Sequence, residues 1–427
     1  MSDLKAMYKT IMDDHFPDEM KISFGNQVLI YRKRTWKLTD DNQLIEKGLR
    51  YGENPGQEAA LYELVGGNLH LGDCVFILPN KGLVSCLSED GLIQFGKHPG
   101  KTNITDIDNA CNILRYLNST PACAIMKHNN PSGVAYGTDA ANAYDMANSA
   151  DRLAAFGGAA VFNVMVDKSA ASLLAQNYLE VVAAPGYSDG AVEILKSRKN
   201  LRIVEIRNLS RIREYAAERF VDFKSLLDGG IIVQQSPLNR IKTTNDFLIA
   251  EAKKKDGTIV KINKIPNESE LNDMMFGWSV EQGVTSNSVI FVKDGKTAAI
   301  GTGEQDRVGV AEIAVFKAYK KYADNICFKK YGCLFFELEL RVKNLSETSD
   351  KVEEIRCEAI EQCGGLKGAV AVSDAFFPKR DGVDVCIKEG ITGIVQPGGS
   401  IADADVIQVC NDANVSMVFT GQRAFKH

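Results

Sequence analysis

The tetrapeptide Lys127-His128-Asn129-Asn130 places a cation, a proton acceptor and two amides directly after the apolar run 122–126. A histidine can take or give a proton at neutral pH, because its unperturbed pKa is about 6.5. A lysine ammonium can stabilise an oxygen on which negative charge develops. Ligands of open α/β sheets bind beyond the carboxyl ends of the strands, so this position suits an acid–base site. An exposed polar turn after a strand is the alternative interpretation.

Two further segments carry groups that can bind anions or amides. Arg50 and Tyr51 lie in the glycine-containing turn segment 49–57, where an arginine fork and a phenol can cradle a phosphate. Asn287 and Arg307 flank a hairpin pattern and offer an amide and a second guanidinium. An ordinary solvated loop, and a hairpin followed by a helix cap, explain these segments without a ligand.

Aromatic and glycine-rich turns follow two strand patterns in the second half of the chain. Phe376 belongs to the segment 373–381, where an exposed ring can stack on a flat heterocycle. The adjacent glycines of 397–400 precede a helix and can bind an anion or a carbonyl group through backbone N–H groups. The C-terminus adds Arg423 and Phe425. The alternative for the Phe376 segment is that its rings belong to the core, and the alternative for the C-terminus is a frayed tail.

The elements that must position these groups alternate along the chain. Short apolar runs and helical patterns follow one another, which indicates an α/β fold with a sheet covered on both faces. Thr105 is expected to be the N-cap of a helix over 105–117. Asp294-Gly295 is expected at the turn of a hairpin. Further helices are predicted at 168–176, 308–322, 382–390 and 402–413.

The chain also contains an internal similarity. Segments 181–204 and 393–419 each read as a strand, Pro-Gly, a polar turn, a helix and a strand. A tandem duplication of one α/β unit explains the similarity economically. Two unrelated βα turns are the alternative.

Composition excludes several classes of protein. The chain has 427 residues, of which 45% are hydrophobic and 25% charged, and a net charge of -5. This balance argues against binding to nucleic acids or to anionic membranes. Ten cysteines form no C-x-x-C pair, so we expect reduced thiols, most of them in the core. The absence of an apolar spanning run or signal-peptide pattern makes a cytoplasmic location the expectation.

The catalytic motif of the zinc deaminases is absent. The sequence has no H-x-E followed by P-C-x-x-C. The groups that remain favour metal-free acid–base chemistry on a phosphorylated, flat substrate that carries an amide.

Several motifs, taken together, point to a known family. LRYGENPGQ, KHNNPSG, AAFGG, APGY, SNS, GTGEQDR, SDAFFPKRD, PGGS and GQRAFKH occur in this order over roughly residues 48–427. The chain resembles the transformylase half of the bifunctional purine-biosynthesis protein. That half is aminoimidazole carboxamide ribonucleotide (AICAR) formyltransferase.

The resemblance implies two tandem cytidine-deaminase-like α/β/α units of three layers, without zinc. The first is expected at 46–205 and the second at 286–427, with a partly helical connection at 206–285 and an N-terminal extension at 1–45. The resemblance also implies a homodimer with active sites at the subunit interface. The cyclohydrolase domain that precedes this half in the family is missing from the sequence, so a separate IMP cyclohydrolase is expected in the pathway.

The implied reaction transfers a formyl group from the co-substrate 10-formyltetrahydrofolate to the 5-amino group of AICAR. Lys127 and His128 match the catalytic pair of the family. His128 would be the general base on the amine, and Lys127 would stabilise the oxyanion or assist proton delivery to the folate nitrogen. Ser288 and Asp374 match positions linked to a monovalent cation, K+. Positions that match substrate contacts are Arg50, Tyr51, Asn109, Phe156, Gly157, Glu180, Asn287, Arg307, Phe376, Asp381, Arg423 and Phe425.

The chain departs from the family pattern at two positions. Gly56 stands where the family usually has histidine, so any role of that histidine is absent. Glu180 stands where some members have aspartate, which keeps the charge and extends its reach.

Two other functions stay open. One is formylation of AICAR with formate plus ATP, against which the absence of a full P-loop pattern counts. The other is a non-catalytic protein that binds purine nucleotides.

Overall fold

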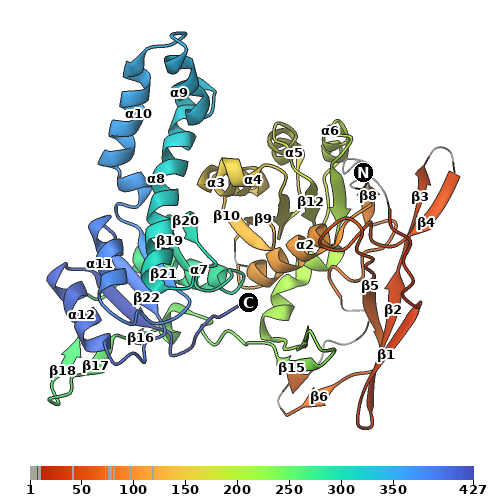
Figure 1. The fold of residues 1–427 in the computed structure, drawn as a ribbon, viewed down its shortest axis with the longest axis horizontal. Coiled ribbons are helices and arrows are strands. Elements are labelled where there is room, and N and C mark those ends of the chain that lie inside the picture. The colour runs from red at the N-terminus through yellow and green to blue at the C-terminus, as the bar shows by residue number, and fades with distance from the viewer. Residues whose placement is uncertain are drawn as a thin grey trace. The chain divides into compact units, whose positions relative to one another are not determined.

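The computed structural model describes residues 7, 11–40, 43–72, 74–75, 79, 82–96, 98–117 and 120–427. The chain divides into two compact units. Unit 1 comprises Met1–Pro121 and Gly157–Leu238, and unit 2 comprises Ala122–Phe156 and Asn239–His427. Figure 1 labels the elements of both.

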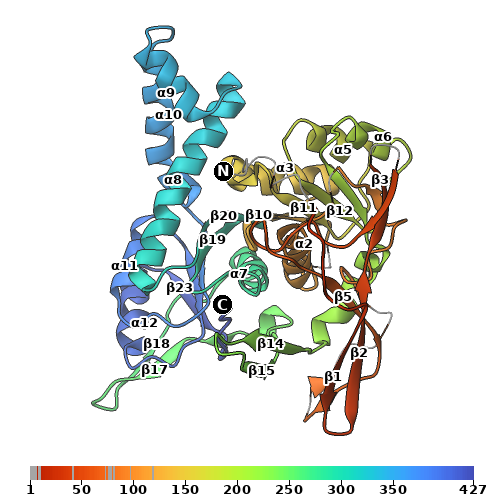
Figure 2. The ribbon, with the colours of Figure 1, turned by 45° about the vertical axis from the view of Figure 1, so that its right-hand side comes forward.

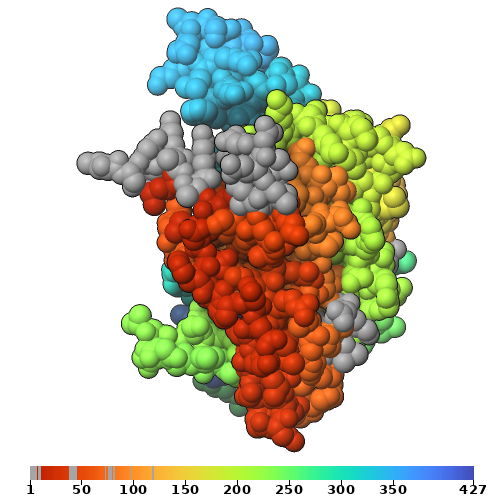
Figure 3. Space-filling model, turned by 90° about the vertical axis from the view of Figure 1, so that its right-hand side faces the viewer, coloured from red at the N-terminus to blue at the C-terminus, as the bar shows by residue number. Residues whose placement is uncertain are grey.

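Unit 1 begins with a three-stranded antiparallel sheet. β1 (Glu19–Phe24) and β2 (Gln27–Arg34) form a hairpin, and β5 (Leu61–Gly66) pairs with the other edge of β2. Leu29 and Leu69 are fully buried in a small core against this sheet. Figure 3 shows these N-terminal strands, in red, on one face of the molecule. Short strands of the unit are β3 (Trp36–Asp40), β4 (Gln43–Lys47), β6 (His70–Leu71), β7 (Cys74–Val75), β14 (Val221–Ser225) and β15 (Ile231–Gln235).

The second part of unit 1 is a parallel α/β sheet. β11 (Ala159–Phe162), β12 (Val181–Ala184) and β13 (Arg202–Glu205) are parallel, and β8 (Leu92–Gln94) adds an antiparallel edge. Every residue of β11 and β12 is buried, which explains why both strands are continuously apolar. The helices of this part are α2 (Lys101–Leu114), α5 (Lys168–Ala175), α6 (Ala191–Lys196) and the 3-10 helix η1 (Arg207–Ala217). Helix α2 packs against β11 (Figure 2).

Unit 2 is built on a mixed sheet with the strand order β16-β23-β22-β21-β19-β20-β10-β9. Its parallel strands β21, β22 and β23 are fully buried, and β9, β10, β19 and β20 are antiparallel. The strands of this sheet are β9 (Ala122–Lys127), β10 (Asn130–Tyr136), β16 (Leu248–Ile249), β19 (Val289–Lys293), β20 (Lys296–Gly301), β21 (Val370–Ser373), β22 (Gly393–Gln396) and β23 (Ser416–Phe419). A separate antiparallel pair is formed by β17 (Glu251–Lys253) and β18 (Ile259–Lys261). The helices are α3 (Ala140–Ala150), α4 (Arg152–Ala155), η2 (Thr244–Asp246), α7 (Glu268–Glu281), α8 (Arg307–Tyr331), α9 (Phe335–Lys343), α10 (Ser349–Glu361), η3 (Cys363–Gly365), α11 (Asp381–Lys388) and α12 (Asp403–Asp412).

The order of elements repeats along the chain. The series α2-β9-β10-α3-β11-α5-β12-α6-β13 is followed by α7-β19-β20-α8-β21-α11-β22-α12-β23, with α4 added to the first series and α9, α10 and η3 to the second. In both series the last three strands are parallel. This agrees with the duplication expected from the sequence, and the repeat extends over more elements than the sequence similarity alone indicates.

Several predicted elements are confirmed, with different limits at some ends. Asp294 and Gly295 both have positive φ and form the turn between β19 and β20. The helices expected at 168–176, 382–390 and 402–413 are α5, α11 and α12. The helix expected at 308–322 is α8, which continues to Tyr331 and ends at Gly332, a left-handed C-cap. Helices α9 and α10 have no counterpart in the sequence prediction; with α8 they enclose their own small core around Leu338 and Ile355.

The expected N-cap of α2 is wrong. The helix begins at Lys101, and Gly100 is its N-cap. The Asn103 side chain accepts a hydrogen bond of 3.1 Å from the Gly100 N–H, which stabilises the earlier start. Thr105 lies within the first turns and donates its hydroxyl to the Thr102 carbonyl at 3.1 Å.

The segment 122–156 packs with unit 2, although the sequence analysis places it in the first subdomain. Ala135 of β10 pairs with Lys296 of β20, which joins the two hairpins into one sheet. The subdomain boundaries expected after residues 45, 205 and 285 stay a prediction. In the described part of the chain, no helix combines the length and apolar character needed to cross a membrane.

Candidate active site

The β9–β10 turn presents the predicted acid–base pair. Lys127 is the last residue of β9 and pairs with Asn130, the first residue of β10. His128 and Asn129, between them, have φ of 53° and 62°. Two positive φ angles in a two-residue hairpin turn correspond to type I′, which favours Gly, Asn and Asp. A histidine here accepts a backbone conformation that L residues seldom adopt, and such positions concentrate at functional sites.

Lys127 is oriented by a second predicted site residue. Its Nζ donates a hydrogen bond of 2.7 Å to the carbonyl oxygen of Phe156. Phe156 is the C-cap of α4, and its side chain is 61% exposed. One of the three ammonium protons is therefore used to fix the lysine, and two remain to contact a ligand.

Asn130 connects the hairpin to the loops around β20. Its Oδ1 accepts hydrogen bonds from the Thr285 N–H at 2.9 Å and from the Thr302 hydroxyl at 3.3 Å. The Thr302 hydroxyl is also 2.7 Å from the Thr285 carbonyl oxygen. The asparagine thus holds the turn in place, and its role in the structure is positional.

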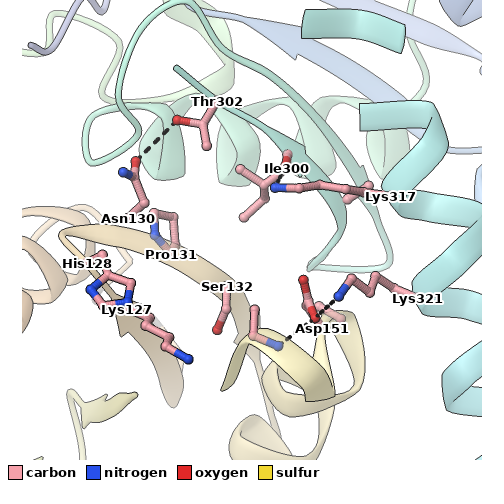
Figure 4. A pocket seen from close by; sticks show the side chains of 13 residues that line it. Lys127, His128, Asn130, Pro131, Ser132, Asp151, Ile300, Thr302, Lys317 and Lys321 are labelled. Atoms are coloured by element: carbon pink, nitrogen blue, oxygen red, sulfur yellow. Dashed lines mark hydrogen bonds and ion pairs between the residues drawn. The ribbon is translucent and has the colours of Figure 1, made fainter. Parts of the chain in front are cut away.

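A cavity of about 170 Å³ opens behind this hairpin (Figure 4). Its lining comes from β9, β10, the α3–α4 junction, β20 and α8. The polar and charged side chains that line it include Lys127, His128, Asp151, Lys317 and Lys321. The predicted acid–base pair therefore lies at the wall of a hollow in the protein.

A second cluster in unit 2 joins four predicted residues through Arg307. This buried guanidinium donates to the Ser288 carbonyl at 2.8 Å and to the Asn287 Oδ1 at 3.0 Å, and it forms an ion pair with Asp374. The cluster also contains Glu281, which sequence reasoning missed. The Ser288 hydroxyl donates to Glu281 Oε2 at 2.6 Å.

Glu281 lies in an unusual environment for a carboxyl group. It is fully buried at the end of α7, and burial, followed by the nearby Asp374, raises its pKa well above the ordinary value. Two buried carboxyl oxygens, Glu281 Oε1 and Asp374 Oδ2, have no hydrogen-bond partner among the residues that the structure describes. Oxygen donors of this kind suit a hard cation. The only sequence signal for Glu281 is its place near the end of the partly helical connection expected at 206–285, shortly before the SNS motif.

The C-terminal segment is attached to the same region. The backbone of Lys426 makes two hydrogen bonds with Ser286, and the Ala424 N–H donates to the Asp374 carbonyl at 2.9 Å. The guanidinium of Arg423 lies 4.7 Å from the centre of the Phe425 ring. The alternative of a frayed tail is therefore wrong.

Unit 1 brings together a different group of predicted residues at the start of α2. Arg50 is only 7% exposed, donates to the Tyr51 hydroxyl at 3.0 Å, and lies over the Tyr51 ring at 4.6 Å. The backbone N–H of Lys101 donates to the Tyr51 carbonyl at 3.1 Å, which ties this pair to the helix N-terminus. Positive charge and a helix N-terminus together attract an anion.

Two residues near Arg50 were missed by sequence reasoning. Arg202 is buried, donates to the carbonyl oxygens of Glu180 and His98, and has its pKa lowered to about 10 by burial and by the charge of Arg50. Asn103 donates to the Glu180 carboxylate at 3.0 Å. The available signal for Asn103 was the adjacent tripeptide Gly-Lys-Thr at 100–102, which opens α2.

The remaining predicted residues have varied surroundings. Asn109 is buried on α2, and Gly157 has a φ of 76°. Phe376 is half-buried, and its neighbour Phe377 lies in the core. The interpretation of these rings as core aromatics therefore holds for Phe377. Asp381 is exposed at the start of α11. Within the described residues, no group of three or more His, Cys, Asp or Glu side chains has a geometry that could hold a metal ion.

Comparisons with known proteins agree with the resemblance found in the sequence. The model of the AICARFT/IMPCHase bienzyme family matches residues 6–317. The bifunctional purine biosynthesis protein PurH of Persephonella marina is 34% identical over 420 residues, which are 97% of this chain and 62% of that protein. PurH of Aquifex aeolicus is 32% identical over 423 residues, 99% of this chain and 65% of that protein. PurH of Clostridium perfringens is 34% identical over 384 residues, 89% of this chain and 58% of that protein.

The chain thus spans about three fifths of the length of these relatives. The family model covers more than half of the chain, and its matched region includes Arg50, the Lys127–His128 turn and Arg307. The chain belongs to the AICARFT/IMPCHase bienzyme family of purine biosynthesis.

Proposed function

We propose that this chain is an AICAR formyltransferase that uses 10-formyltetrahydrofolate. The observation that carries the proposal is the position of Lys127 and His128 together in a type I′ turn at the wall of a cavity. Membership of the family supports the substrate, because its PurH relatives are purine biosynthesis proteins. The tandem cytidine-deaminase-like architecture without zinc belongs to the same proposal and is supported by the repeated order of elements.

In the proposed reaction, the 5-amino nitrogen of AICAR attacks the formyl carbon. A C–N bond forms as the carbonyl electron pair moves to oxygen, and His128 takes the amine proton. Collapse of this intermediate breaks the bond between the formyl carbon and the folate nitrogen, which leaves with a proton that Lys127 helps to deliver. Acid–base assistance of this kind accelerates reactions by about 10²–10⁴-fold.

Lys127 has a second role in the proposal. Its ammonium is fixed by the Phe156 carbonyl and keeps two N–H donors for the developing oxyanion. This explains why a backbone carbonyl, rather than a carboxylate, is its partner: a carboxylate would neutralise the charge that the oxyanion needs.

Arg50 and Tyr51 at the start of α2 are proposed to hold the nucleotide phosphate, with Arg423 and Phe425 as further contacts. Asn109, Phe156, Gly157, Glu180, Asn287, Arg307, Phe376 and Asp381 are proposed to contact AICAR or the folate. The proposal includes a homodimer with active sites at the subunit interface, and a cytoplasmic location.

A monovalent cation is proposed near Ser288 and Asp374. The two carboxyl oxygens on Glu281 and Asp374 that have no hydrogen-bond partner among the described residues fit such an ion. When bound, the cation would add positive charge beside these two carboxyl groups, next to Arg307, which already pairs with Asp374. With or without the cation, the hydrogen bond from Arg307 to the Asn287 Oδ1 fixes these two side chains relative to each other.

The proposal is tested by mixing the purified protein with AICAR and 10-formyltetrahydrofolate. Release of tetrahydrofolate with formation of formyl-AICAR is expected, and the variant His128→Asn is the control for acid–base catalysis. Assay of inosine monophosphate in the same reaction tests whether ring closure needs a separate cyclohydrolase, as proposed. Transfer with formate plus ATP alone, or AICAR binding without transfer by any donor, would replace the proposal with one of the two alternatives.

A further inference from the structure

The deep side of the cavity behind the Lys127–His128 turn contains charged groups that the proposed reaction does not use. Helix α8 contributes Lys317 and Lys321, which lie one turn apart and both line the cavity (Figure 4). Asp151, between α3 and α4, is the one carboxylate among the described residues of the lining. Three lysines, including Lys127, face this single carboxylate, so the lining carries an excess of two positive charges.

The lone carboxylate is already neutralised. Asp151 forms an ion pair of 2.8 Å with Lys321, and both side chains are largely buried. The same carboxylate caps α4 by accepting a hydrogen bond of 2.9 Å from the Ala154 N–H. The positive charge of Lys317 therefore has no anionic group of its own in the cavity.

Lys317 is held with its charge only partly satisfied. Its Nζ donates to the Ile300 carbonyl oxygen at 3.0 Å and forms no ion pair among the described residues. Burial lowers the pKa of this lysine, against the weaker opposing effect of Asp151. A partly buried ammonium with a carbonyl partner alone is costly, and a bound anion would reduce that cost.

The other polar groups of the cavity leave the lysines as its main donors. The Ser132 hydroxyl donates to the Ile125 carbonyl at 3.1 Å, and the Thr302 hydroxyl donates to the Thr285 carbonyl at 2.7 Å. The lining also contains the polar side chains of His128 and Asn130, and its apolar part includes Ala150, Ala154 and Ala299.

The side chains that line the cavity determine which class of anion it can bind. Alanine side chains give no hydrogen bonds to a phosphate dianion, whose desolvation is expensive. A carboxylate carries one charge, and the carbon that bears it can contact the apolar wall. We propose that this cavity is a carboxylate subsite in which Lys317 binds the carboxylate and the Lys321–Asp151 pair forms the wall. Two sources share this chemistry: the glutamate portion of the reduced folate and free formate. The choice between them rests on the proposed function.

The experiment compares Lys317→Met with the matched control Lys320→Met. Lys320 lies on the same helix, is exposed and does not line the cavity. For each protein, KM is measured for AICAR, for 10-formyltetrahydrofolate and for 10-formyltetrahydropteroate, which lacks the glutamate. Binding of sodium formate is measured separately by thermal stabilisation, against sodium chloride at equal ionic strength. Lys317→Arg is included to restore the charge.

If the folate tail occupies the subsite, Lys317→Met raises KM for the glutamate-bearing donor about 10-fold or more, because a charge-assisted hydrogen bond is lost. The KM values for the truncated donor and for AICAR then stay unchanged, and Lys317→Arg recovers part of the loss. If formate occupies it, formate stabilises the wild-type protein and Lys320→Met, and this effect is lost in Lys317→Met.

Equal behaviour of Lys317→Met and Lys320→Met in both measurements overturns the inference. Failure of the wild-type protein to transfer formyl groups refutes the proposed function, and the formate measurement still decides the subsite.

Discussion

The Nζ of Lys127 donates a hydrogen bond of 2.7 Å to the backbone carbonyl oxygen of Phe156. The two residues are far apart in sequence, and both were expected at the site from their motifs. The bond fixes the lysine without neutralising it, since a carbonyl group carries no net charge. The geometry therefore keeps a cation available next to His128.

Lys127→Met is expected to lower kcat by about 10²–10⁴-fold, because the charge that stabilises the oxyanion is removed. AICAR binding, measured by calorimetry, should change little. Lys320→Met serves as a control for the loss of one positive charge on an exposed part of the same unit. A Lys127→Met enzyme with near-normal kcat would exclude the lysine from the mechanism.

Variants of His128 separate the proposed catalytic role of its side chain from the strain of its positive φ. His128→Asn removes the base but keeps a residue that tolerates positive φ, so kcat should fall by about 10²–10⁴-fold with little loss of stability. His128→Gly should be equally inactive and slightly more stable, because glycine adopts this φ without steric cost. Thermal unfolding and steady-state kinetics test both variants. Retention of kcat in either one contradicts the role of general base.

Arg50→Lys is expected to weaken AICAR binding about 10-fold or more, because an ammonium cannot reproduce the forked donor geometry of the guanidinium. Arg50 is buried beside Tyr51, so the effect should appear in the dissociation constant for AICAR and be small for the nucleoside without phosphate. Arg211→Met, at an exposed arginine of the same unit, is the control. Equal losses for nucleotide and nucleoside would assign Arg50 a structural role only.

Arg423→Ala is expected to raise the AICAR dissociation constant, and removal of residues 421–427 should raise it further. The larger deletion also removes the backbone bonds between Lys426 and Ser286. Each lost hydrogen bond is worth about 1 kcal/mol. Binding calorimetry on both variants is the measurement. Unchanged affinity after the deletion would show that the attached tail does not take part in nucleotide binding.

Lys317→Met should stabilise the ligand-free protein near neutral pH. Burial lowers the pKa of Lys317 from its ordinary value of 10.5, so its ammonium costs folding free energy at every pH below the folded-state pKa. That cost disappears as the pH rises from the folded-state pKa to 10.5. The difference in melting temperature between variant and wild type should therefore be positive at neutral pH and shrink at alkaline pH. A difference that is independent of pH would contradict this interpretation of the buried charge.

Local patterns in the sequence determined many of the elements and the Lys127–His128 turn. The apolar strands, the Asp294-Gly295 turn and the residues that follow β9 are set by neighbours in the chain, because hydrophobic period and turn preference act over a few residues. The family was identified for the same reason, since its motifs are short and occur in order. Helix ends were less accurate, as Thr105 shows, because a cap depends on which of several nearby polar groups reaches the backbone.

Only the tertiary structure decided which charges meet. Arg307 contacts Asp374, Lys321 pairs with Asp151, and Arg202 lies within the electrostatic influence of Arg50, in each case across long separations in sequence. Burial then determines what each charge does, because desolvation depends on all elements that pack around a group. For that reason no local motif singled out Glu281, Arg202 or Lys317, whereas the Lys127–His128 turn stood out in the sequence.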